Sequence, residues 1–497
     1  MEQGIRNVNL VRKPNKLANM SETRIILISV ILLILSGCAG TEPAGSYQPA
    51  AVRAVAVPPK GVLHSGGKTD ASKAIVVQGP IDLRQAIDLA LTNNPDVAAA
   101  GFDAMAAQAE LDFAKAERLP ILGVVGGYAH HLDEQRLLPV RQPGDPTILS
   151  RDIISGDLVL TLPLFTGGQL VNQMRAAELL RNAANHLLAH SREELIFNVS
   201  SMFFSILAQK RVVESLEFSR QVLQEHLKRV DALVAAQKAA EVDRLRTKVR
   251  LADIEQRLVR EENVLAIQRR AWVNLLGLPP TESGINEAPF PQGELISKQE
   301  NVVPDFDSAL ELAWEKRDDY LSARSALEAQ ARQVEVARAG HWPSVYLAGS
   351  YGERWAVGPT SGLGEETDDI GRIGIAADIP IFEGGRVEAK VAEQRAKLAA
   401  ARERLRKLEL QIRLDVQTAL LNIQSSQQRI EAIKTAVEQA DESLRIEREK
   451  YELGKGAIVD VLDAQDALLE SQTNYYRALA DYNVAVAQLH LAVGEEM

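Results

Sequence analysis

The chain has little cysteine, few aromatic residues and no excess of basic charge. Its single cysteine, Cys38, excludes an internal disulfide framework and any metal site built from several cysteines. The formal net charge of −11 argues against the overall basic field that attracts nucleic acid. Aromatic residues make up only 5% of the 497 residues. With abundant Ala, Leu, Glu, Arg and Gln, this composition favours long helices over a β-sandwich or a Rossmann layer.

Catalytic groupings are also missing from the sequence. No Ser/His/Asp arrangement and no cleft of paired acids can be argued, so we expect neither an enzyme nor a cofactor. His186 and His190 share a helix face and have a spacing that suits a metal ion. No acid accompanies them as in HExxH, and we expect no metal there.

The N-terminus contains an apolar run, Ile25–Leu35, which follows Arg24. The run is too short to span a bilayer but is typical of the core of a signal peptide. It continues into Leu-Ser-Gly-Cys ending at Cys38, which resembles a bacterial lipobox. That resemblance implies cleavage before Cys38 and lipidation (palmitate) of its thiol. Ala39, rather than an aspartate, then implies sorting to the outer membrane.

These features divide the start of the chain into two segments. Residues 1–37 are predicted to be a lipoprotein signal peptide, with Met20 a more ordinary start than Met1. Residues 38–80 are rich in Pro, Gly, Ala and Val without helical periodicity and are predicted to be a tether.

The remaining chain repeats itself once. AIDLA at 86–90 matches ALELA at 309–313 with an offset of 223 residues, and LPLFTGG at 162–168 matches IPIFEGG at 379–385 with an offset of 217. The second offset also carries Asp243 onto Asp460. We therefore predict one repeat at 81–280, a Pro- and Glu-rich linker at 281–304 and a second repeat at 305–497.

Each repeat is expected to contain the same elements in the same order. These are a helix (83–118; 307–340), two strands (121–131 and 152–162; 344–354 and 370–379) around a polar loop (133–151; 355–369), and a long helix (169–237; 386–453) with a shorter antiparallel helix after it. In the second long helix, a 4-3 spacing of apolar residues runs from Ile412 to Leu444, which predicts a coiled-coil seam. About 68 helical residues would extend on the order of 100 Å.

The strands alternate between polar and apolar faces. Asp157 lies opposite Ile154 and Leu158, and Arg372 and Asp378 lie opposite apolar neighbours on their own strand. This period of two is typical of a barrel wall between lipid and water. We therefore predict that Asp157, Arg372 and Asp378 line a barrel lumen.

Four strands cannot close a barrel alone, because the smallest known types need about eight. Open sheet edges inside a membrane would leave backbone groups unsatisfied. Two copies of four strands would give eight with little lumen, whereas three copies would give twelve and a channel. The fold expected is an α+β membrane channel in which long helices continue the barrel.

The sequence resembles the TolC family of outer-membrane channel proteins. The resemblance rests on LPLFTGGQ and IPIFEGGR, on YELGKGAIVDVLDAQ at the last hairpin tip, and on GLPP and AVG closing the repeats. It implies a homotrimer with a 12-stranded barrel in the outer membrane and a coiled-coil tunnel through the periplasm. It also implies a periplasmic adaptor and an inner-membrane pump as partners, with the chain as a passive exit duct for efflux or secretion.

The resemblance further implies a gate at the last hairpin tip. Asp460 and Asp463 match the aspartates of the family's constriction and share a helix face, so a trimer would stack two cation-selective carboxylate rings. Asp243 is the repeat equivalent of Asp460, and Tyr451 matches a tyrosine of the gate's hydrogen-bond network. Gly456 stands where the best-studied member has a gate arginine, and the adjacent Lys455 is the candidate substitute.

Two other functions remain open from the sequence. One is a coiled-coil scaffold lipoprotein without a pore, although a scaffold as such has no need for a lipobox or for alternating strands. A stand-alone diffusion porin would share the barrel but would work without a pump. Acids at a helix N-terminus also have an ordinary explanation, because they complement the helix dipole.

Overall fold

A computed structural model describes residues 79–137, 139, 148–278, 289–296, 304–362 and 367–495. Every described residue belongs to a single compact unit of the chain, which lies within 54–497. The predicted signal peptide, the lipidation site Cys38, nearly all of the tether and much of the 281–304 linker lie outside the described residues.

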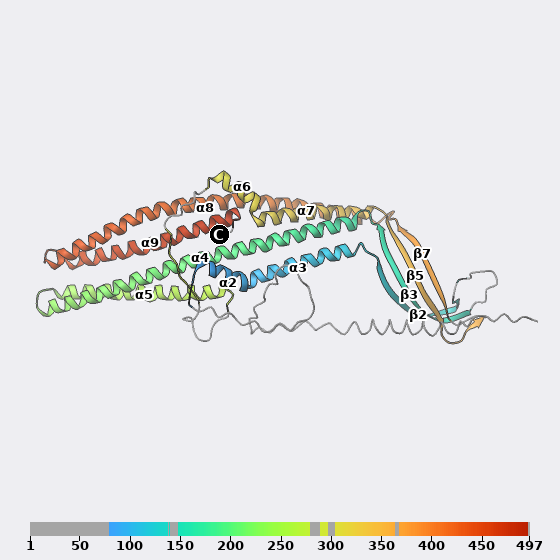
Figure 1. Cartoon of the computed structure of the whole chain (residues 1–497), viewed down its shortest axis with the longest axis horizontal. Helices are drawn as coiled ribbons and strands as arrows, with labels where there is room; N and C mark the ends of the chain where they lie inside the picture. Colours follow the sequence, from blue (N-terminus) through green and yellow to red (C-terminus); the bar gives the residue numbers. More distant parts are fainter. Residues whose placement is uncertain are drawn as a thin grey trace, which may run out of the picture. The chain divides into compact units, whose positions relative to one another are not determined.

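The same order of elements occurs twice along the described chain (Figure 1). The first set is α2 (Leu83–Asn93), α3 (Pro95–Ala116), β2 (Ile121–Arg136), β3 (Ile148–Phe165), α4 (Gln169–Ala235) and α5 (Glu241–Leu275). The second set is α6 (Phe306–Lys316), α7 (Asp318–Arg338), the 3-10 turn Ala339–His341, β5 (Ser344–Ala356), β6 (Ser361–Gly362), β7 (Thr367–Asp378), α8 (Arg386–Glu452) and α9 (Ile458–Val493). The long helices predicted at 169–237 and 386–453 are confirmed almost to the residue.

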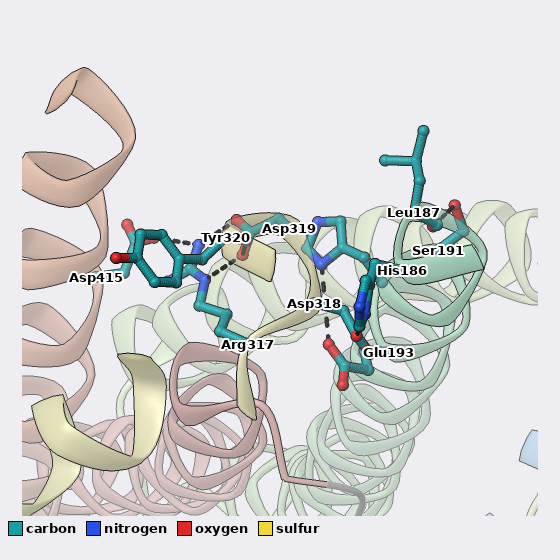
Figure 2. A network of polar contacts seen from close by, with 10 residues as sticks. His186, Leu187, Ser191, Glu193, Arg317, Asp318, Asp319, Tyr320 and Asp415 are labelled. Carbon is teal, nitrogen blue, oxygen red and sulfur yellow. Dashed lines mark hydrogen bonds and ion pairs between the residues drawn. The ribbon is translucent and has the colours of Figure 1, made fainter. Parts of the chain in front are cut away.

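The single helices predicted at 83–118 and 307–340 are wrong, because each is broken near its start. At the first break, Asn94 has an extended backbone (ψ 127°) and caps α3 by accepting a hydrogen bond from the Asp96 N–H at 2.8 Å. Pro95 follows it, and a proline disfavours helical geometry in the preceding residue. At the second break Arg317 adopts the same geometry (ψ 114°) without a proline. Its guanidinium pairs with Asp319 at 2.9 Å and Asp415 at 3.0 Å (Figure 2).

The last glycine of each repeat packs against the break at the start of that repeat. Gly277 (φ +68°) and Gly494 (φ +73°) both have left-handed backbones. A Cβ on Gly277 would lie 2.4 Å from the Asn93 carbonyl oxygen, and one on Gly494 would lie 2.8 Å from the Arg317 nitrogen. Only glycine fits such a close approach of two backbones. The start and end of each repeat are therefore joined in the same way.

The long strands form one antiparallel sheet in the order β2-β3-β5-β7, with the short β6 paired to the first residues of β3. Its two hairpins have equivalent registers. Ile121 pairs with Thr161 in the first hairpin, and Ser344 pairs with Asp378 in the second. The offset of 223 carries Ile121 onto Ser344, and the offset of 217 carries Thr161 onto Asp378. The strands are longer than predicted and extend into the expected loops at 133–151 and 355–369. Backbone pairing between the strands continues beyond the residues at which polar and apolar side chains stop alternating.

The helices pack as two antiparallel hairpins, α4–α5 and α8–α9, with α9 also lying along α4 (Figure 1). The predicted seams are buried at Val199, Ile206 and Leu223 in α4 and at Ile412 and Ile423 in α8. Among the described helices, none is both long enough and apolar enough to cross a membrane.

Gln209, a polar residue in the apolar seam of α4, is buried and forms hydrogen bonds to α5. The Gln209 amide donates to the Glu261 backbone oxygen at 3.0 Å and to its carboxylate at 2.9 Å. Burial by itself would raise the pKa of Glu261, but the hydrogen bonds from Gln209 and Arg260 and the charge of Arg477 hold it below its usual value. Because Arg477 belongs to α9, this contact also links the two hairpins.

Short segments on either side of the first repeat are paired with each other. β1 (Pro80–Ile81), at the end of the predicted tether, forms a parallel pair with β4 (Phe290–Pro291) of the linker. The Trp272 indole donates to the Pro289 carbonyl at 3.1 Å, and Asn483 donates to the Ile296 carbonyl at 2.9 Å. The described part of the linker is thus fixed against both hairpins.

Candidate functional site at the hairpin tips

The predicted tip at Gly454 is a tight turn between α8 and α9. Gly454 has a left-handed backbone (φ +68°), and the N–H groups of Lys455 and Gly456 both donate to the Lys450 carbonyl, at 2.9 and 3.1 Å. The following helix, α9, starts after Ala457. The turn therefore satisfies carbonyl oxygens at the end of α8 that would otherwise lack partners.

Asp460 and Asp463 lie in the first turns of α9 but have different partners. The Asp460 carboxylate accepts a hydrogen bond from the Ala457 N–H at 3.3 Å and so satisfies a free donor at the helix start. The Asp463 carboxylate accepts from the Arg250 guanidinium of α5 at 3.2 Å, with 66% of the Asp463 side chain exposed. The first acid acts within its own helix, and the second connects two helices.

Sequence reasoning missed the basic residues opposite these acids. Arg250 also pairs with Asp466 at 3.0 Å, and Arg257 pairs with the same carboxylate at 3.4 Å. Arg250 and Arg257 are seven residues apart and share one face of α5, as Asp463 and Asp466 share one face of α9. That periodicity is present in the sequence, but nothing in it says that these two faces meet.

Tyr451 and Asp243 were both predicted at the gate, and the charge of Asp243 affects the Tyr451 hydroxyl at the tips. Burial raises the pKa of Tyr451, and the negative charge of Asp243 raises it further. The ring of His226, on α4, lies 5.6 Å from the Tyr451 ring. Burial lowers the pKa of His226, and the nearby charges of Arg229 and Arg448 lower it further. His226 was not singled out from the sequence, because a lone histidine on a helix carries no signal.

Gly456, where a gate arginine was expected, faces the end of α8. A Cβ at this position would lie 3.0 Å from the Lys450 Cβ and 3.2 Å from the Tyr451 nitrogen, so the turn favours glycine here. Lys455 is exposed and has no ion-pair partner within the described part of the chain. The contacts of Lys455 thus give no support for its role as a substitute.

The predicted lumen residues share one face of the sheet. Cross-strand pairs point the same way, and the pairs Asp157–Gly352, Val159–Ser350 and Ser350–Arg372 bring Asp157 and Arg372 to one side. Asp378 lies on that side too, because it is six residues beyond Arg372 on the same strand. Asp157 pairs with Arg354 at 2.9 Å, and Arg372 donates to the Ser350 hydroxyl at 3.2 Å. Arg354 was missed from the sequence.

The two histidines weighed as metal ligands have acidic partners instead. His186 Nδ1 lies 2.6 Å from the Asp318 carboxylate at the start of α7 (Figure 2), and His190 Nδ1 lies 3.8 Å from the Glu193 carboxylate. No group of three or more His, Cys, Asp or Glu side chains suited to a metal ion occurs in the described ranges.

Comparison with known proteins follows the same two-repeat division. The outer membrane efflux protein family model matches residues 86–278 and 309–495. The chain is 24% identical to outer membrane protein TolC of Escherichia coli K12, over 82% of this chain and 81% of that protein. It is 23% identical to the probable outer membrane lipoprotein SilC of Salmonella typhimurium, over 94% and 98%. In fold it is similar to the outer membrane protein VceC of Vibrio cholerae, with a TM-score of 0.69 and 22% identity over 83% of this chain and 96% of VceC.

Proposed function

This chain belongs to the outer membrane efflux protein family, and we propose that three copies of it form one channel closed by their edge strands. The chain is an outer-membrane channel component of an efflux or secretion system, with its helices in the periplasm. Its partners are a periplasmic adaptor and an inner-membrane pump. The chain itself is a passive duct, because the pump supplies the energy for transport.

The observation that carries the trimer is the sheet with two open edges. β2 and β7 are the outer strands of the sheet, and their side chains are exposed almost throughout. Unpaired edge groups are costly inside a bilayer. The long strands of one chain are too few for a barrel, which needs about eight, whereas three copies supply twelve. Pairing β7 of one copy with β2 of the next removes every edge.

The internal duplication specifies how those strands would pair. Within one chain, β3 of the first repeat meets β5 of the second, and Thr161 pairs with Ala348. The offset of 217 carries Thr161 onto Asp378 of β7, and the offset of 223 carries Ala348 back onto Val125 of β2. The equivalent pair between copies is therefore Asp378 of one copy and Val125 of the next. Because both hairpins already obey these offsets, we expect the junction between copies to repeat the junction within the chain.

The two faces of such a barrel would differ as a channel wall requires. The face bearing Asp157, Arg372 and Asp378 would line the lumen. The opposite face, with exposed Leu158, Ile373 and other apolar side chains, would contact lipid. Asp460 and Asp463 would then form the carboxylate rings at the far end of the helices, with Tyr451 and Asp243 beside them.

We further propose that Cys38 carries a lipid anchor. The support is its place directly after the apolar run Ile25–Leu35, and a relative that covers nearly the whole chain is itself named an outer membrane lipoprotein. One chain anchored by lipid and by barrel strands would stay in the outer membrane through two independent attachments. Mass spectrometry of the mature N-terminus would detect the acyl groups, and an unmodified cysteine would contradict the anchor.

The test of the channel is the state of the purified protein and the transport that it supports. We expect a trimer that dissociates only on heating in SDS and that conducts ions in planar bilayers. A strain lacking the gene should accumulate more of the exported drug, dye or metal. Reduced uptake would indicate a diffusion porin instead, and a monomer without conductance that becomes soluble after Cys38→Ala would indicate a scaffold lipoprotein.

A further inference from the structure

We infer that a stripe of arginines on α8 lines the helical tunnel near the barrel and binds anionic groups of the molecules that pass through it. The arginine stripe consists of Arg395, Arg402, Arg406 and Arg413. The inference rests on the proposed channel function and names a class of exported substrate: molecules that carry carboxylate, phosphate or sulfonate groups.

The four arginines share one face of α8. Arg402, Arg406 and Arg413 follow Arg395 by 7, 11 and 18 residues. At about 3.6 residues per turn, these spacings are close to whole numbers of turns, so the four side chains project in nearly the same direction. All four are exposed. At roughly 1.5 Å per residue, the stripe extends over about 27 Å of the helix.

The arginine stripe differs from other basic positions of α8 in its lack of acidic partners. Lys390 and Lys397 both pair with Glu393, at 2.9 and 2.6 Å. A helix surface that serves solubility alone typically pairs its charges in this way. Within the described ranges, Arg406 is the single member of the stripe with an ion pair, at 3.7 Å from Glu403. The guanidinium groups of the stripe are therefore available to a ligand.

The face of the stripe has an excess of positive charge. Two acids, Glu388 and Glu409, lie on the same face, seven residues before Arg395 and seven after Arg402. Four arginines against two acids leave two positive charges in excess on this face of each chain, although the whole chain has a net charge of −11. Three copies would bring three such stripes around one tunnel.

The duplicated helix shows that the fold itself does not require these arginines. The offset of 217 carries the stripe onto α4, which forms the same part of the first repeat. The residues at the matched positions are Glu178, Asn185, Ala189 and Ile196. A helix of equal length thus forms in the first repeat without a basic stripe, and a ligand accounts for the stripe better than folding does.

The opposite face of α8 lies on the outside of the tunnel. Asp415 follows Arg406 by nine residues, about two and a half turns, and so projects from the opposite face. Asp415 pairs with Arg317 at the start of α7 at 3.0 Å, and the adjoining α6 packs over α8 and α9. The helix α2 packs on α4 in the first repeat. Short helices such as these, two from each copy, would block the tunnel if they lay inside it. We therefore place α6 outside and the arginine stripe inside.

Guanidinium groups suit this role because they form paired hydrogen bonds with carboxylate and phosphate oxygens. The stripe also lies far from the acids of the tip. Arg413 is 39 residues from Glu452 at the end of α8, which corresponds to about 60 Å. Charges are screened over roughly 8 Å at physiological ionic strength. The tip and the stripe therefore act on passing molecules independently.

The experiment measures block of single-channel currents by inorganic tripolyphosphate in planar bilayers that contain purified trimers. The blocker is added on the barrel side, so that it reaches the stripe without passing the acids of the tip. We expect Arg395→Gln with Arg402→Gln to raise the concentration for half block roughly tenfold, because two of four guanidinium groups are lost. Block of the wild type should weaken as ionic strength increases.

Lys397→Gln with Arg404→Gln is the matched control. These bases are two residues beyond Arg395 and Arg402, at the same level of α8 but on its opposite side, and they are exposed too. The control removes the same charge and should be blocked like the wild type. Heat-modifiable trimers on SDS gels establish folding of each variant.

The outcomes separate the stripe from the channel itself. Conducting trimers with equal block in the wild type and in the Arg395/Arg402 variant would overturn the inference and leave the channel intact. Weaker block in the control alone would place the stripe on the outer surface, and equal loss in both variants would assign block to overall charge; either result would also overturn it. A wild type without trimers or conductance would instead contradict the proposed function.

A second measurement tests the direction of the face without an anionic ligand. Cysteines are introduced one at a time as Arg402→Cys and Arg404→Cys and are modified with a bulky uncharged maleimide. The label should lower the conductance of Arg402→Cys, where it would stand in the tunnel, and leave that of Arg404→Cys unchanged. The reverse pattern, or no change in either labelled variant, would overturn the inference.

Discussion

Gln237 and Gly454 occupy the same left-handed backbone position at the two hairpin tips. They are related by the offset of 217 residues, and their φ angles are +60° and +68°. Gln237 is the single non-glycine residue with positive φ among the described residues. The duplicated turn therefore keeps its backbone geometry in both repeats, although only the second has the residue type that adopts it without strain.

Gln237→Gly should stabilise the first tip. A side chain in this region costs about 1 kcal/mol, and part of that gain is offset by the greater freedom of glycine in the unfolded chain. We expect slower hydrogen exchange of the amides at 233–241 in detergent-solubilised trimers. The reverse change, Gly454→Gln, should accelerate exchange at 450–458. Equal exchange in all three proteins would contradict the assignment of strain to the turn.

Cysteines at Val125 and Asp378 should cross-link neighbouring copies. The proposed register between copies would place them opposite each other on the lumen face, so the double variant should yield covalent trimers on non-reducing SDS gels after oxidation. Val125→Cys with Ala377→Cys is the matched control, since Ala377 points to the other face of β7. Efficient cross-linking of the control and not of the test pair would show that the strands between copies are shifted by one residue.

Removing the acidic rings should reduce cation selectivity. Asparagine is the better substitution, because Asp460 caps α9 through the Ala457 N–H and an amide oxygen keeps that acceptor. For Asp460→Asn with Asp463→Asn we expect the cation-to-anion permeability ratio from reversal potentials to fall towards unity, together with weaker block by multivalent cations. Asp481→Asn, on an exposed part of α9, should change neither. Unchanged selectivity of the double variant would place the constriction elsewhere.

Acid should loosen the tip through His226. Its folded pKa lies below the usual value near 6.5, so the histidine is neutral in the closed tip at neutral pH. Protonation would place a third positive charge beside Arg229 and Arg448, against the uncharged Tyr451 ring. Glu452 faces the same group but is already paired with Arg229 at 3.6 Å. Above about pH 6.5, His226 therefore does not weaken the closed form. As the pH falls below that value, the equilibrium constant for closing decreases by up to about tenfold per pH unit.

The measurement is open probability between pH 7.5 and 5.5. It should rise on acidification in the wild type and stay nearly constant in His226→Gln, which is uncharged throughout. His190→Gln, at a histidine far from the tips along α4, is the control and should behave like the wild type. A wild type insensitive to pH, or an unchanged rise in His226→Gln, would exclude this histidine as the group that titrates.

Several features were predictable because they depend on local chemistry repeated along the chain. The seam spacing of α4 and α8 fixed two long helices, since an apolar stripe of this period buries only along another helix. The alternation around Asp157 and Arg372 fixed strands with one polar face, because successive side chains point to opposite sides. The helix breaks at Asn94 and Arg317 were missed, although Pro95 marked the first of them. At Arg317 the break is held by Asp415, a residue about a hundred positions away.

The amino-acid sequence by itself determined the duplication, the elements of each repeat and the candidate acids at the last tip. Only the tertiary structure decided which faces of those elements meet. Arg250 and Asp463, Asp157 and Arg354, and His226 and Tyr451 are each brought together from different helices or strands. Periodicity states which residues share a face of one element, but the partner of that face depends on the packing of the whole chain.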